Sequence, residues 1–92
     1  MNFTGGKTMA YLWTTGQPIK ATVGSDGVPV RFKLGERWHT VERVLDRWRV
    51  DEGWWEKRVW RSAFRLITRD GLLVVVYRDL LEKKWYLQRL YD

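Results

Sequence analysis

The sequence predicts a small all-β domain in which five to six antiparallel strands close into a barrel-like sheet. Three observations support this prediction: short segments alternate apolar with polar residues, glycine-containing turns separate them, and β-branched and aromatic residues fill them. At 92 residues the chain has room for one domain. We expect a flexible arm over residues 1–17, which lack a sustained period and end before Pro18, and a single β domain over residues 18–92.

The first element we expect is a hairpin. Residues 19–23 and 28–33 both alternate apolar with polar side chains, and the Ser-Asp-Gly sequence at residues 25–27 is typical of the turn between two strands. Gly35 and Glu36 indicate a second turn directly before the next segment. A third strand of the same sheet is therefore expected to follow.

Residues 37–50 fit either a strand or a helix. Their apolar residues fall at helical spacings, but the β-branched and aromatic content and the short preceding turn favour a strand. One face of that strand would carry Arg37, His39, Arg43, Arg47 and Arg49, interrupted by Val41 and Leu45. The other face would carry Trp38, Val44, Trp48 and Val50.

The rest of the chain predicts one irregular segment and three strands. Asp51 and Glu52, followed by Gly53, are expected to break the long strand as a structural corner, and residues 54–63 predict a short helix or an irregular loop. Strands are expected over residues 64–69, 72–77 and 85–91, with a hairpin turn at residues 70–71 and a looser turn over 79–84. The apolar run 72–77 is typical of a central strand buried on both faces. The last strand is expected to point Trp85, Leu87, Arg89 and Tyr91 the same way.

Charge and aromatic content indicate a surface that binds a partner. The chain has 17 Lys and Arg against 11 Asp and Glu, a net charge of +6, and it has 7 tryptophans. Residues 31–69 hold 11 cations and 6 anions, so most of the excess lies in the middle of the chain. Nine of those cations are arginines, which are suited to bidentate phosphate contacts and to stacking on rings.

Catalytic and metal chemistry find little support in the sequence. The chain has no cysteine, its only histidine is His39, and neither Ser25 nor Ser62 has an evident catalytic partner. The acidic pair at residues 51–52 would point to opposite faces of an extended chain. We therefore expect no enzyme activity, no metal and no cofactor. No apolar run is long enough to span a membrane, and the lack of cysteine fits a reducing compartment, so we expect a soluble cytoplasmic protein.

Single-stranded nucleic acid is one partner that the basic and aromatic residues suggest, because cations track phosphates while aromatic faces stack on bases. The candidate contacts are Arg31, Lys33, Arg37, Trp38, Arg43, Arg47, Arg49, Trp54, Trp55, Lys57, Arg58, Trp60 and Arg61. The tryptophans could instead pack in the core. We favour the core over ligand contact for Trp38, Trp48 and Trp85, and the two roles are evenly balanced for Trp54, Trp55 and Trp60. The same residue types anchor protein interfaces, so a protein partner or a homodimer competes with nucleic acid.

The C-terminal half carries a set of residues that resembles a known family. The set comprises Trp48, Val50, Asp51, Glu52, Trp54 and Trp55, the strand at Phe64 with its Asp70-Gly71 turn, Arg78-Asp79, Trp85-Tyr86 and Tyr91-Asp92. On these residues the stretch 48–92 resembles a small bacterial domain of unknown function that also occurs, in a diverged form, at the C-terminus of ImuB-type proteins, inactive relatives of Y-family translesion polymerases. The resemblance implies a cytoplasmic, non-catalytic accessory module that works with DNA or repair-polymerase proteins, and it carries over no catalytic residue.

Overall fold

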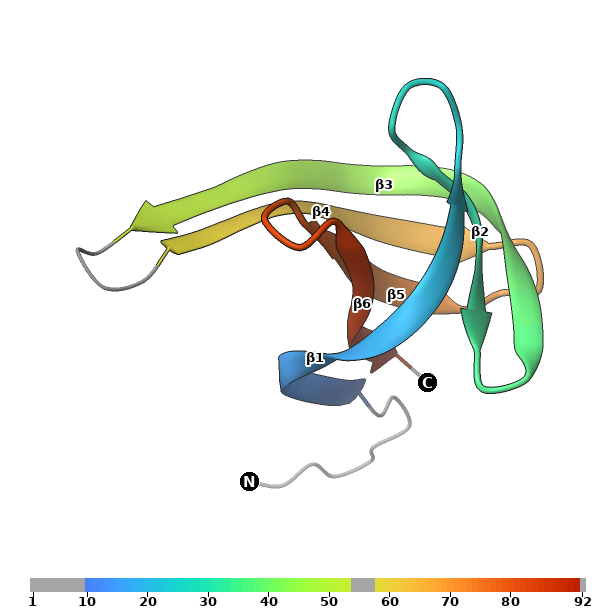
Figure 1. Cartoon of the computed structure of the whole chain (residues 1–92). Helices are drawn as coiled ribbons and strands as arrows, with labels where there is room; N and C mark the ends of the chain where they lie inside the picture. Colours follow the sequence, from blue (N-terminus) through green and yellow to red (C-terminus); the bar gives the residue numbers. More distant parts are fainter. Residues whose placement is uncertain (1–9, 54–57, 92) are drawn as a thin grey trace.

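The computed structural model describes residues 10–53 and 58–91, and within them six antiparallel strands form a closed barrel (Figure 1). The strands are β1 (Ala10–Val23), β2 (Pro29–Leu34), β3 (Arg37–Gly53), β4 (Arg58–Thr68), β5 (Leu73–Asp79) and β6 (Lys84–Tyr91). Each strand pairs with the next one along the chain, and β1 closes the barrel by pairing with β6 as well as β2. The predicted all-β barrel is confirmed. The described part of the chain contains no helix long and apolar enough to cross a membrane.

Strand β1 begins earlier than the sequence suggested. Residues 10–17, which we assigned to the arm, belong to β1, and Ala10 lies opposite Tyr91 of β6. The register shifts between Leu12 and Gln17, which explains why this stretch shows no regular period. Gly16 lies within this irregularity at a φ of 82°, and a Cβ there would be 2.5 Å from the Tyr77 hydroxyl oxygen, so only glycine fits. The rest of the predicted arm lies outside the described residues.

Strand β3 is longer than expected and continues through the predicted corner. Residues 51–53 lie in β3 opposite residues 58–60 of β4, so Asp51 and Glu52 do not break the strand. Of the predicted helix or loop, residues 58–63 are strand, and 54–57 lie outside the described residues. Cross-strand hydrogen bonds supply backbone partners that local sequence cannot reveal, which is why a breaker-like Asp-Glu-Gly sequence is extended here. The choice of strand over helix for residues 37–50 is confirmed.

Two β-bulges in β3 change which side chains share a face. The register shifts between Val41 and Arg43 and again between Val44 and Asp46. Residues directly opposite each other share a face, and Val41, Val44 and Arg47 lie opposite Thr68, Leu66 and Phe64 of the barrel interior. The predicted faces of β3 are therefore wrong for Arg43 and Val44: Val44 shares the inward face with Arg47, while Arg43 lies on the outward face. Each register shift reverses the alternation of side chains, so the second shift restores the alternation that the first one reversed. Trp38 and Trp48 therefore both lie on the outward face.

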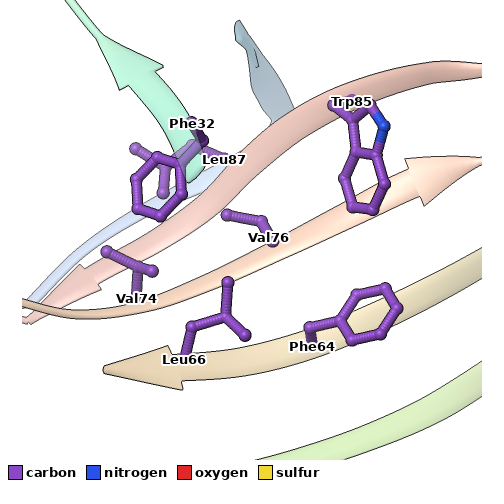
Figure 2. Close-up of a cluster of buried hydrophobic side chains, with 7 residues drawn as sticks. All are labelled: Phe32, Phe64, Leu66, Val74, Val76, Trp85 and Leu87. Atoms are coloured by element: carbon purple, nitrogen blue, oxygen red, sulfur yellow. The ribbon is translucent and has the colours of Figure 1, made fainter. Parts of the chain in front are cut away.

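The core lies between β2, β4, β5 and β6. Its seven buried side chains are Phe32, Phe64, Leu66, Val74, Val76, Trp85 and Leu87, and Figure 2 shows them converging on one space inside the barrel. The Phe64 and Trp85 rings pack with their centroids 5.8 Å apart. Residues 74–77 are all buried, which confirms that the apolar run forms a central strand with both faces covered.

We expect Leu66→Ala to lower the free energy of unfolding by about 2–5 kcal/mol, because Leu66 has no exposed surface and its loss leaves a cavity. The matched control is Leu81→Ala, since the Leu81 side chain is 51% exposed and should change stability by less than about 0.5 kcal/mol. Urea unfolding followed by tryptophan fluorescence measures both. Equal destabilisation by the two variants would contradict this description of the core.

Candidate functional site

The barrel separates the predicted binding residues into three groups. Arg31, Lys33, Arg37 and Trp38 lie at the β2–β3 turn; Arg47, Arg49, Arg58 and Trp60 are on the inward face of β3 and β4; Arg43 and Arg61 are on the outward face. Trp54, Trp55 and Lys57 lie outside the described residues. The basic middle of the chain therefore does not form one continuous surface.

At the β2–β3 turn, the cations are partly occupied within the fold. The guanidinium carbon of Arg31 lies 4.3 Å from the centre of the Trp38 ring, and the Lys33 amino group lies 4.0 Å from Glu36. Trp38 is nevertheless 40% exposed, so it is not a core residue. Lys20 lies directly opposite Lys33 and adds a cation that sequence reasoning did not include.

On the inward face near the end of β3, Arg58 has two structural contacts. Its Nη2 atom lies 3.3 Å from Asp51 Oδ1, and its guanidinium carbon lies 4.7 Å from the centre of the Trp60 ring. Asp51 therefore forms its ion pair with Arg58 across the end of the β3–β4 ladder. This cluster holds the ends of β3 and β4 together, and Arg58 and Trp60 are engaged in it.

On the outward face, Arg61 belongs to a stack of side chains across three strands. Its guanidinium carbon lies 4.2 Å from the centre of the Tyr77 ring, and the Tyr77 and Tyr86 rings stack at 5.2 Å. The Tyr86 hydroxyl donates a 2.7 Å hydrogen bond to Glu82, and this bond raises the pKa of Tyr86 to about 12. The stack covers the sheet, so we assign Arg61 a packing role.

A hollow of about 290 Å³ opens on the outward face beside this stack, and we call it the outward hollow. It is lined by Asp46, Trp48, Arg65, Val75, Gln88, Arg89 and Tyr91. Trp48 is 41% exposed, so its favoured assignment to the core is wrong. Arg65 lies 4.0 Å from Asp46, and Arg89 donates a 2.9 Å hydrogen bond to the Tyr91 hydroxyl. The outward hollow thus combines an exposed indole with two guanidinium groups.

Sequence reasoning missed Arg65, Arg89 and Tyr91 as site residues. Arg65 could have been found, because it alternates with the buried Phe64 and Leu66 along β4. Arg89 and Tyr91 could not, because the register shifts between Val75 and Val76 where β5 pairs with β6. That shift places Trp85 and Leu87 inward but Arg89 and Tyr91 outward, and so corrects the single face expected for them.

No protein-family model, curated protein or solved structure matches the chain. Among the residues that the structure describes, no group of three or more His, Cys, Asp or Glu side chains could hold a metal ion. Function therefore has to be argued from the side chains of the site itself.

His39 is held in a hydrogen-bonded cluster with Asp70 and Thr68. The His39 Nδ1 atom lies 2.9 Å from Asp70 Oδ2, and the Thr68 hydroxyl donates to Asp70 Oδ1 at 2.6 Å. The hydroxyl also accepts a 2.8 Å bond from the backbone N–H of Leu72. The Thr68 hydroxyl faces Asp70 and not the imidazole, so the cluster is not a nucleophile–base pair. It ties β3 to the β4–β5 turn, and His39 is buried against Phe32.

The hydrogen bonds from Thr68 and His39 hold the pKa of Asp70 below its ordinary value of 3.8. Between the lower pKa of the folded chain and 3.8, the unfolded chain therefore binds more protons at Asp70 than the folded chain does. The contribution of Asp70 to the free energy of unfolding is complete above pH 3.8 and is lost as the pH falls through the pKa of the folded chain. We expect the free energy of unfolding to fall on acidification below about pH 4 by more in the parent chain than in Asp70→Asn. Urea unfolding between pH 2.5 and 6 measures this, and identical pH profiles would contradict it.

Proposed function

We propose that the chain is a non-enzymatic module that binds single-stranded nucleic acid through the outward hollow. The observation that carries the proposal is the exposure of Trp48, a large aromatic side chain that the core does not use. Its cross-strand neighbour is the small, buried Ala63, so the indole has little bulk beside it on β4. An indole in this position offers a surface on which an unpaired base can stack.

Charge around Trp48 supports the same assignment. Arg65 and Arg89 line the hollow with it, and the whole chain carries a net charge of +6, which attracts a polyanion. Only an unpaired base exposes its face to an aromatic side chain, so the arrangement favours a single strand over a duplex. The guanidinium groups of Arg65 and Arg89 would contact a phosphate next to the stacked base.

We further propose that the module acts in the bacterial cytoplasm as an accessory to DNA repair, in contact with DNA or a repair-polymerase protein. The support for this part is the resemblance of residues 48–92 to the family found at the C-terminus of ImuB-type proteins. Trp48 begins that stretch and Tyr91 lies near its end, and both line the outward hollow. The resemblance and the hollow therefore involve the same part of the chain.

A homodimer is the second candidate, and one observation favours it. Pairing between β2 and β3 ends at Arg31 and Thr40, so beyond Thr40 one edge of β3 has no strand partner among the described residues. Such an edge can pair with a second chain. Two bulges and several charged side chains lie along this edge, however, and both features are used by proteins to prevent such pairing. We therefore place the homodimer after nucleic-acid binding.

We expect Trp48→Ala to weaken binding to a single-stranded oligonucleotide roughly 5- to 150-fold, the factor that corresponds to one stacked base. Trp48→Phe should retain most of the affinity because phenylalanine keeps an aromatic face. Fluorescence anisotropy of a labelled oligonucleotide measures the dissociation constant for each variant.

Trp38→Ala is the matched control, since Trp38 is 40% exposed but lies outside the outward hollow. It should leave the affinity nearly unchanged. If Trp38→Ala abolishes binding while Trp48→Ala does not, the site has been placed on the wrong surface. Absence of binding, together with a light-scattering mass of two chains, would instead favour the homodimer.

A further inference from the structure

We infer that a bound single strand crosses the free edge of β3 at Trp48, with one phosphate on the outward face and the next on the inward face. Arg65 and Arg89 would hold the first phosphate, and Arg47, Arg49 and Ser62 the second. The inference rests on the proposed function, which it extends by naming the path of the strand.

Two hollows share Trp48 as a common wall. The second, about 190 Å³ and here called the edge hollow, is lined by Arg47, Trp48, Arg49 and Ser62. Arg49 lies directly opposite Ser62, and Arg47 lies opposite the inward Phe64, so these side chains belong to the inward face. Trp48 and Arg65 belong to the outward face. A base stacked on Trp48 would therefore have cations on both sides of the sheet.

The β3 edge between the two hollows has no strand partner among the described residues. Among the described strands, β3 beyond Thr40 pairs only with β4, and Figure 1 shows the two strands extending as a ribbon past the others. Backbone N–H groups along the unpaired edge can donate hydrogen bonds to phosphate oxygens. Three consecutive residues of β3, 47–49, line the edge hollow, so the guanidinium groups of Arg47 and Arg49 lie beside this unpaired edge.

Arg47 and Arg49 are available for a phosphate. In the described part of the chain, the neighbouring carboxylates of Asp51 and Asp46 lie within 4.0 Å of Arg58 and Arg65 respectively, and neither Arg47 nor Arg49 forms an ion pair. The guanidinium carbon of Arg47 lies 5.4 Å from the centre of the Phe64 ring, a contact that leaves its N–H donors free to bind an anion. Both arginines are exposed.

The alternative path runs along β3 to Trp38, and two features oppose it. Arg31 already lies over the Trp38 ring. The two bulges between residues 41 and 46 bend β3, so its outward side chains do not form a straight row between the tryptophans. The crossing at Trp48 leaves the Arg31–Trp38 contact intact.

Two double variants distinguish the paths, each removing two cations. Arg47→Gln with Arg49→Gln removes the charges of the edge hollow, and glutamine keeps a stem to cover Phe64. Arg31→Gln with Lys33→Gln removes two charges at the β2–β3 turn. Binding of a dT10 oligonucleotide is measured by anisotropy between 50 and 300 mM salt, where each phosphate contact on a single strand contributes about 0.7 to the slope of log K against log salt.

The first double variant should reduce that slope by about 0.7, because Arg47 and Arg49 together hold one phosphate, while the second should leave it unchanged. A reduced slope only in the Arg31/Lys33 variant, or equal reductions in both variants, would overturn the crossing path while leaving the proposed function in place. If Trp48→Ala binds as tightly as the parent chain, the proposed function itself fails. Circular dichroism and urea unfolding confirm that each variant compared is folded.

Discussion

The two β-bulges in β3 are the constraint on which the rest of the structure depends. β3 pairs with β2 through residue 40 along one edge and with β4 from residue 41 along the other. Each bulge adds a residue and increases the local twist, and this change of direction lets the sheet close on itself. The same bulges place Val44 on the inward face and Arg43 on the outward face, and the two shifts cancel before Trp48.

Arginine side chains pack against aromatic rings in this small barrel. The large number of arginines is therefore not by itself evidence of a binding function. Among the residues that the structure describes, five guanidinium groups lie over aromatic rings, those of Arg31, Arg47, Arg58, Arg61 and Arg89. A domain of this size has no second layer to cover its rings, and a long apolar stem with a charged end covers a ring while staying hydrated. The basic composition is thus partly a consequence of the fold. The cations that the proposed binding would use are those beside an exposed ring or an open edge.

Local sequence patterns were sufficient to predict the fold class, but not to predict which face of each strand a side chain occupies. The turn at Asp70-Gly71 and the apolar run at residues 72–77 were predicted correctly because both depend on neighbours in sequence. The faces of Arg43 and Val44 in β3 and of Arg89 and Tyr91 in β6 were not, because a bulged residue reverses the side chains that follow it until a second bulge restores them. Charge identified Arg47 and Arg49 as candidate contacts, but the outward hollow is assembled from β3, β4, β5 and β6 and depends on register. Long-range pairing likewise extended β1 and β3 beyond their predicted ends.

The free edge of β3 suits an anionic strand better than another β-strand. Strand addition needs a regular ladder of backbone groups, and the bulges interrupt that ladder at residues 41–46. A phosphate needs only a few convergent donors, which the side chains of Arg47 and Arg49 and the edge backbone provide within one hollow. A second copy of the chain would also have to bring its own arginines close to these, at an electrostatic cost that a polyanion does not incur. The arginines that disfavour pairing of this edge with a second copy are thus the same arginines that the proposed nucleic-acid binding would use.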